Sequence, residues 1–131
     1  MKLDHIGIAV DDLDVARKLY GELLGFELGE VEELPDRQLK ICFVKVGEAN
    51  VELLWPSAPE SAVAKFLAAK GPGIHHLCYR VDDVQAKLDA LRAAGLKLID
   101  EKPRPGAHNT LVAFIHPKSA GGVLTELCQD A

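Results

Sequence analysis

The chain has 131 residues, of which 48% are hydrophobic and 27% charged, and its formal net charge is −5. This length fits one domain, and the composition excludes an intrinsically disordered protein. No stretch approaches the roughly 20 apolar residues of a membrane-spanning helix, and the acidic balance argues against a nucleic-acid-binding protein. The N-terminus has no signal-peptide pattern, so we expect a cytoplasmic protein.

The first half of the chain predicts a strand, a helix and three further strands. The expected elements are a strand at 5–10, a helix at 13–24 and strands at 26–31, 39–46 and 51–55. Asp12 stands where a helix N-cap belongs, and Gly25 stands where a left-handed residue ends a helix. A linker with a short helix around 61–69 follows.

The second half repeats this order. Residues 5–13 read His-Ile-Gly-Ile-Ala-Val-Asp-Asp-Leu, and residues 76–84 read His-Leu-Cys-Tyr-Arg-Val-Asp-Asp-Val. Asp83 and Gly95 occupy the cap positions of the second expected helix, and strands are expected at 96–99, 111–115 and 123–128. The fold class is therefore α+β, with two tandem βαβββ modules in residues 1–131: module one at about 1–56, a linker at 57–73 and module two at about 74–131.

Each half carries one histidine at the start of its first strand and one carboxylate in its last strand. These residues are His5 with Glu52, and His76 with Glu126. An isolated buried carboxylate costs several kcal/mol, and a shared divalent cation would remove that cost. Two histidines and two glutamates suit zinc, cobalt, nickel, iron or manganese. The alternative, two solvent-facing glutamates with incidental histidines, does not explain the repetition.

Other polar residues have plainer interpretations. His75 faces the opposite side of its strand from His76, because successive side chains alternate. His108 and His116 have no repeat partner and are expected in loops, with at most a role in substrate binding. Cys42, Cys78 and Cys128 are odd in number and lack C-x-x-C spacing, which predicts reduced core thiols.

The motifs resemble the vicinal oxygen chelate superfamily, and within it the methylmalonyl-CoA epimerase family. The resemblance covers nearly the whole chain. It rests on Asp4-His5-Ile6-Gly7-Ile8-Ala9-Val10, Val51-Glu52-Leu53-Leu54, Gly73-Ile74-His75-His76, the run from Asp100 to His108, His116-Pro117-Lys118-Ser119 and Gly121-Gly122-Val123-Leu124-Thr125-Glu126-Leu127.

The resemblance implies a cup-shaped mixed sheet of the glyoxalase type with one divalent metal ion. The implied ligands are His5, Glu52, His76 and Glu126; cobalt is the first expectation, with zinc, nickel or manganese as alternatives. The implied reaction interconverts the (R) and (S) forms of methylmalonyl-CoA through a metal-stabilised enolate. An acyl-CoA substrate and a homodimer are implied as well.

The resemblance also implies roles for individual side chains. Glu126 is expected to transfer a proton, and Glu52 is one candidate for the second acid or base. Lys118 and Ser119 are expected to bind substrate, and Lys40 and Arg104 are further candidate contacts for its anionic groups. Some epimerases carry a glutamate at the position of Ile41, so that base is missing here.

Two other functions compete with the epimerase. A glyoxalase-I-like isomerase would act on a thiol hemithioacetal with the same metal site. A non-catalytic small-molecule-binding member of the superfamily would lack the metal ligands, and the four ligand residues count against it.

Overall fold

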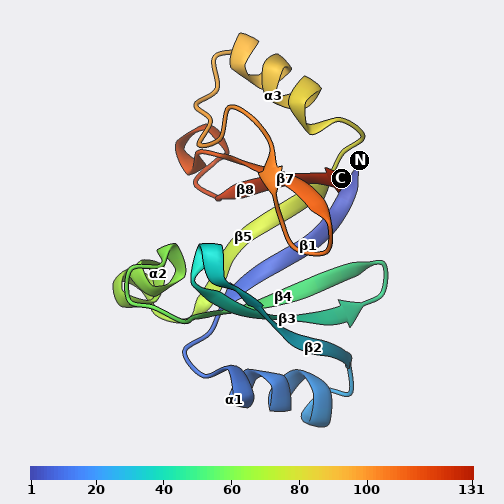
Figure 1. The fold of residues 1–131 in the computed structure, drawn as a ribbon, viewed down its shortest axis with the longest axis vertical. Helices are drawn as coiled ribbons and strands as arrows, with labels where there is room; N and C mark the ends of the chain where they lie inside the picture. Colours follow the sequence, from blue (N-terminus) through green and yellow to red (C-terminus); the bar gives the residue numbers. More distant parts are fainter. The chain divides into compact units, whose positions relative to one another are not determined.

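Each half of the chain forms a strand, a helix and three further strands (Figure 1). The structure is a computed structural model that describes all of residues 1–131. Residues 5–75 form one unit, called the first unit below, and residues 1–4 with 76–131 form the second unit. The expected α+β class with two βαβββ modules is confirmed. The expected single domain with its linker at 57–73 stays a prediction.

The first unit holds the first module and the connecting helix. Its elements are β1 (Lys2–Ala9) from residue 5 onward, α1 (Leu13–Arg17), the π-helix η1 (Lys18–Leu23), β2 (Glu27–Leu34), the 3-10 helix η2 (Pro35–Arg37), β3 (Leu39–Val46), β4 (Ala49–Pro56) and α2 (Ala62–Lys70). The strands lie in the order β2-β3-β4-β1. β1 and β4 are parallel, whereas β3 is antiparallel to both β2 and β4.

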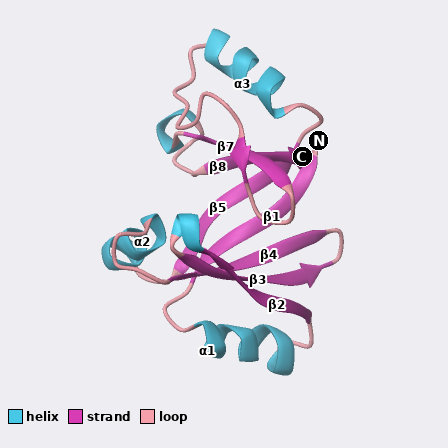
Figure 2. Cartoon of the chain, in the orientation of Figure 1, coloured by secondary structure: helices cyan, strands magenta, loops and turns pink.

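The second unit repeats this arrangement. Its elements are β5 (Gly73–Arg80) from residue 76 onward, α3 (Val84–Ala93), β6 (Arg104–Pro105), β7 (Thr110–Ile115), the 3-10 helix η3 (Pro117–Ser119) and β8 (Thr125–Asp130). The strands lie in the order β5-β8-β7-β6, with β5 parallel to β8 and the other neighbours antiparallel. Figure 2 shows the two helix-and-strand sets by element type. None of the helices is long and apolar enough to span a membrane.

Both predicted N-caps are confirmed. The Asp12 carboxylate accepts a hydrogen bond from the Val15 N–H at 3.0 Å, and the Asp83 carboxylate accepts one from the Ala86 N–H at 3.0 Å. Gly25 and Gly95 follow the helices with φ of 86° and 90°, the left-handed region that glycine enters without steric cost. Each capped helix therefore begins directly after the strand that carries a candidate histidine.

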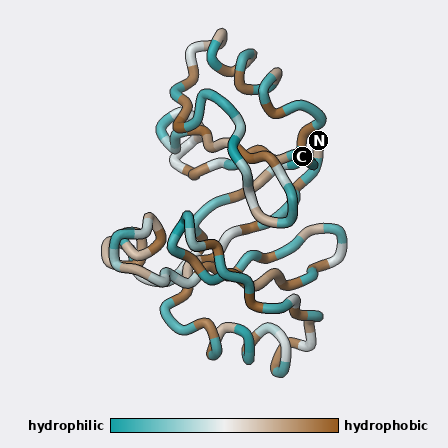
Figure 3. Tube along the Cα trace, in the orientation of Figure 1, coloured by the Kyte–Doolittle hydropathy of each residue, from teal (hydrophilic) through white to brown (hydrophobic).

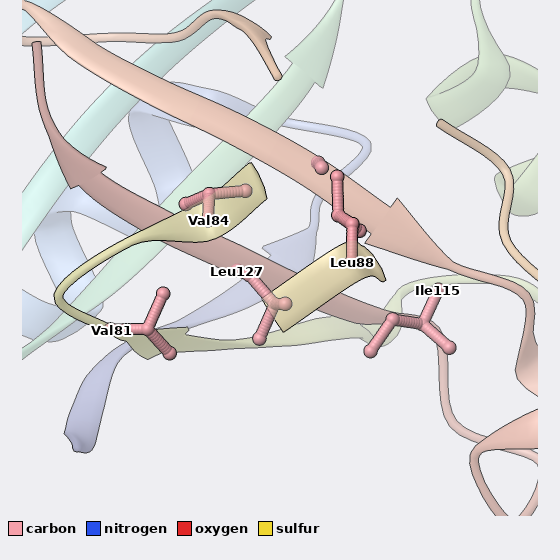
Figure 4. Close-up of a cluster of buried hydrophobic side chains, with 6 residues drawn as sticks. Val81, Val84, Leu88, Ile115 and Leu127 are labelled. Carbon is pink, nitrogen blue, oxygen red and sulfur yellow. The ribbon is translucent and has the colours of Figure 1, made fainter. Parts of the chain in front are cut away.

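Each unit packs its helix on one face of its sheet. In the second unit, Val84 and Leu88 of α3 are fully buried and contact Leu127 and Ile115 (Figure 4). In the first unit, Leu13 of α1 packs with Cys42, Val44 and Leu53, and Ile8 and Val10 lie against this cluster. Figure 3 shows polar and apolar residues alternating along the helices, as one-sided packing requires.

The predicted strand at 96–99 is wrong. Only Leu98 forms an isolated bridge there, with Ile115, and the short strand β6 lies instead at Arg104–Pro105. The Lys97 N–H is held by the Ser119 hydroxyl at 2.8 Å, and the Ile99 and Asp100 N–H groups share the Phe114 carbonyl. With its donors bound in this irregular way, the segment cannot form a regular ladder.

The first predicted helix also differs in detail. It begins at Leu13 as expected, but after Arg17 it continues as a π-helix to Leu23. The spacing of apolar residues predicts that a helix is present, yet it does not separate the two hydrogen-bonding patterns.

Candidate functional site

In the first unit, strand pairing brings His5 and Glu52 together. β1 runs parallel to β4, and the register pairs Gly7, two residues after His5, with Glu52. The His5 Nε2 and Glu52 Oε1 atoms are 3.6 Å apart. Both residues are buried, with 6% and 7% of their surface exposed. The face of β1 that carries His5 is thus an interior face.

The second unit builds the same arrangement from different residues. Cys78, two residues after His76, pairs with Glu126 across the parallel strands β5 and β8. The His76 Nε2 and Glu126 Oε1 atoms are 3.3 Å apart, and both residues are buried, at 4% and 3% exposed. The repeat seen in the sequence is therefore reproduced in strand register, burial and distance.

These two pairs have the donor chemistry of a transition-metal site. Two donors that each lie about 2.0–2.2 Å from one ion are separated by roughly 2.8–3.1 Å at octahedral angles and roughly 3.3–3.6 Å at tetrahedral angles. The pair distances of 3.3 and 3.6 Å lie near these ranges. They exceed the roughly 2.9 Å typical of an N–H···O hydrogen bond. Within each unit, the residues fit a divalent metal ion.

The sequence analysis missed one phenylalanine in each half. Phe43 pairs with Glu52 across β3 and β4, and its ring meets the His5 ring edge-on, with centroids 6.0 Å apart at 87°. Phe114 pairs with Glu126, and its ring meets the His76 ring at 5.7 Å and 80°. Edge-to-face contacts of this kind restrict how an imidazole can rotate. The signal was a single aromatic residue in the strand before each glutamate strand.

His75, the neighbour of His76 in β5, packs against helix α2. Its ring contacts Phe66 of α2, with centroids 5.0 Å apart at 71°, in the first unit. This contact gives His75 a structural role. Ile41, where some epimerases carry a glutamate, is fully buried, so an apolar side chain occupies that position.

The residues of the 116–119 segment make mainly structural contacts. The His116 ring accepts a hydrogen bond from the Lys118 N–H through Nδ1 at 3.1 Å and caps η3. The Ser119 hydroxyl accepts the Lys97 N–H at 2.8 Å. The side chain of Lys118 is exposed. His108 is exposed at the turn before β7, with a φ of 55°.

The three cysteines are free and buried. A hydrogen bond with Cys128 and burial of the sulfur hold the pKa of the Cys78 thiol far above its usual range. Cys78 is consequently a protonated core thiol, in line with the sequence analysis.

The Arg80 guanidinium at the end of β5 binds two carboxylates. Its Nη1 lies 2.8 Å from Asp130 and its Nε lies 3.0 Å from Asp4. The hydrogen bond to Asp130 raises the pKa of Arg80, and the bond to Asp4 adds to this rise.

Comparison with known proteins places the whole chain in one family. Residues 4–114 match the model of the Glyoxalase/Bleomycin resistance protein/Dioxygenase superfamily. An ethylmalonyl-CoA/methylmalonyl-CoA epimerase of Cereibacter sphaeroides is 40% identical over 131 residues, which cover 98% of this chain and 97% of that protein.

Solved structures agree with this match. The crystal structure of methylmalonyl-CoA epimerase from Mycobacterium tuberculosis superimposes with a TM-score of 0.93 at 43% identity, over 99% of this chain and 88% of that chain. A methylmalonyl-CoA epimerase in complex with methylmalonyl-CoA and NH4+ gives a TM-score of 0.93 at 35% identity, over 99% and 94% of the two chains. The chain therefore belongs to the methylmalonyl-CoA epimerase family of the glyoxalase/bleomycin resistance protein/dioxygenase superfamily.

Proposed function

We propose that this chain is an enzyme that interconverts the (R) and (S) forms of methylmalonyl-CoA. The observation that carries the proposal is the buried His–Glu pair in each unit, with Nε2–Oε1 distances of 3.6 and 3.3 Å. The family relationship along the chain supports the same reaction. Each pair places an imidazole nitrogen beside a carboxylate oxygen, and these are donor atoms that divalent transition-metal ions prefer.

In this proposal His5, Glu52, His76 and Glu126 together hold one divalent metal ion. When bound, such an ion supplies Lewis-acid stabilisation of the negative charge that develops on the thioester oxygen. Cobalt is the ion to test first, and zinc, nickel and manganese share the preference for histidine and carboxylate donors. The edge-on contacts of Phe43 and Phe114 hold the two imidazoles in place.

The reacting bond is the C–H bond of the carbon between the thioester and the carboxylate. A base removes this proton, the electron pair of the bond delocalises onto the thioester oxygen, and a proton returns on the other face. We propose Glu126 for one of these transfers, because its carboxylate is buried, at 3% exposed, and lies beside the proposed ligand His76. Glu52 is the candidate for the other, since the fully buried Ile41 has no ionisable group.

Hydrogen exchange at the reacting carbon tests the proposal. One epimer of methylmalonyl-CoA incubated with metal-loaded protein in deuterated water should gain deuterium at that carbon and lose optical purity. Glu126→Gln, a nearly isosteric change, should slow exchange by several orders of magnitude because it removes the base. Metal content measured on the same variant separates loss of the base from loss of the metal.

The competing functions predict other outcomes. A glyoxalase-like isomerase would convert a glutathione or bacillithiol hemithioacetal and leave methylmalonyl-CoA unexchanged. A non-catalytic binding protein would do neither. Metal-replete protein that exchanges no proton on methylmalonyl-CoA would remove the epimerase proposal.

The proposal also includes substrate contacts, an assembly state and a location. Lys118 and Ser119, both in η3, are proposed to contact the acyl-CoA. Alanine substitution of Lys118 should raise KM without lowering kcat. A homodimer and a cytoplasmic location complete the proposal, and light scattering and cell fractionation test them.

A further inference from the structure

Arg104 lies on the same sheet face as the His76–Glu126 pair. In register, Arg104 pairs with Val112, Val112 is two residues from Phe114, and Phe114 pairs with Glu126. Paired residues share a face, and so do residues two apart on a strand. With neighbouring strands about 4.8 Å apart, the Arg104 backbone lies roughly 10 Å across the sheet from β8.

The Arg104 side chain crosses part of this distance. Its guanidinium carbon lies 5.5 Å from the centroid of the Phe114 ring, and that ring meets the His76 ring at 5.7 Å. A cation over an aromatic face is attracted by the ring quadrupole. One aromatic ring therefore contacts both the candidate metal ligand and the Arg104 cation.

Asp100 fixes the guanidinium by one edge only. One of its carboxylate oxygens lies 3.3 Å from the Arg104 Nε, and the other accepts the Phe114 N–H at 2.9 Å. The Asp100 side chain is 18% exposed, whereas that of Arg104 is 45% exposed. Both Nη groups of Arg104 are outside this ion pair, and they form the fork that binds a carboxylate with two hydrogen bonds.

The other candidate cations lack such an arrangement. Lys40 is bound at 3.6 Å to Glu33 and lies over the Trp55 ring. Lys118 is exposed and has no ion pair. Of these three cations, Arg104 alone is linked through a shared ring to one of the His–Glu pairs.

We propose that Arg104 binds the free carboxylate of the acyl group and so selects carboxylated acyl-CoA esters over uncharged ones. The inference rests on the proposed function, because that function sets the acyl group beside His76 and Glu126. The carboxylate is one carbon from the thioester, whereas the CoA phosphates are separated from it by the whole pantetheine arm. A cation one ring away from His76 is therefore placed for the carboxylate.

Binding of malonyl-CoA and propionyl-CoA, measured by titration calorimetry on metal-loaded protein, tests this inference. The two ligands differ in the free carboxylate, and neither has a stereocentre to epimerise. Arg104→Gln should weaken malonyl-CoA binding about 10- to 100-fold, the usual effect of losing a charged hydrogen bond, and leave propionyl-CoA binding unchanged. Arg104→Lys keeps the charge without the fork, and its affinity for malonyl-CoA should be intermediate.

Arg92 provides a matched control. Its side chain is 43% exposed and pairs with Asp89 at 3.1 Å in the same unit, on helix α3. Arg92→Gln should leave both affinities unchanged. Circular dichroism establishes that each variant is folded, which is expected because both arginine side chains lie partly exposed at the surface.

Each result decides the inference. If Arg104→Gln weakened the binding of both ligands equally, Arg104 would be assigned to the CoA phosphates. If it weakened the binding of neither, Arg104 would have no role in binding them. Both results overturn the inference. Wild-type protein that epimerises methylmalonyl-CoA while Arg104→Gln binds malonyl-CoA normally would overturn this inference alone. Arg104-dependent selection of malonyl-CoA by a protein that exchanges no proton would overturn the proposed function alone.

Discussion

Alanine substitution of the adjacent residues His75 and His76 should affect metal binding differently: the first variant should keep its metal and the second should lose it. His75→Ala removes a ring contact with Phe66, whose centroid is 5.0 Å away. An edge-to-face aromatic pair contributes about 0.5–1.5 kcal/mol, so the melting temperature should fall by about 4 °C. The metal content should stay near one ion per chain, because His75 is not among the proposed ligands.

His76→Ala removes an imidazole whose Nε2 lies 3.3 Å from Glu126. Substituting a residue that hydrogen-bonds to a metal ligand already lowers metal affinity about 10- to 100-fold. Substituting the ligand itself should lower the affinity by more than this. At a metal concentration of 100 times Kd, the wild type gains about 2.7 kcal/mol of stability from the metal. His76→Ala should lose most of this metal-dependent gain.

Elemental analysis of the purified variants measures the metal content, and chelator competition measures the metal affinity. Thermal unfolding with and without metal measures the stability that the metal contributes. The His75→Ala protein is the control, since it differs from His76→Ala by one position in the chain. A His76→Ala protein that retains metal, beside a His75→Ala protein that loses it, would refute the ligand assignment and the strand register on which it depends.

Three further predictions follow from burial and capping. Leu88→Ala, at a fully buried position of α3, should destabilise the protein by about 2–5 kcal/mol in urea unfolding, whereas Val15→Ala, at 64% exposed, should change stability by less than about 0.5 kcal/mol. Asp83→Ala should cost about 1 kcal/mol by removing the N-cap, and Asp83→Asn should restore most of it, so equal losses would contradict a capping role. Because a hydrogen bond with Cys128 and burial raise the pKa of the Cys78 thiol, a thiol reagent at pH 8 should leave Cys78 unmodified until denaturant is added, and rapid labelling of Cys78 in the folded protein, located by peptide mass spectrometry, would disprove its burial.

Most of the fold could be predicted from the internal repeat, which indicated two βαβββ modules. Asp12 and Asp83 identified both helix starts, because a short side chain that can accept a backbone N–H is strongly favoured there. The choice of His76 over His75 depended on the repeat, because His76 precedes Val81-Asp82-Asp83 as His5 precedes Val10-Asp11-Asp12. Alternation along the strand then places His75 on the other face. Local rules of this kind can be read from one chain.

What the sequence did not reveal depends on distant partners. The segment 96–99 has a strand-like composition, yet its N–H groups bind the Ser119 hydroxyl and the Phe114 carbonyl. The ring contacts of Phe43 and Phe114 also depend on which strands pair and in which register. An apolar pattern specifies a buried face without specifying the residue opposite, so these contacts required the structure.

The matching registers of the two His–Glu pairs have a consequence for the origin of the chain. A polypeptide containing one half alone would carry two of the four proposed donors, and two copies would have to meet to supply the rest. When two such halves are fused in one chain, they are present in equal number, and the sequence of each half can change independently. The edge strands already differ: β2 spans eight residues with four glutamates, whereas β6 has two residues and carries Arg104. Duplication of one half would account for the matching donors, and the different edge strands give the two halves different groups at their borders.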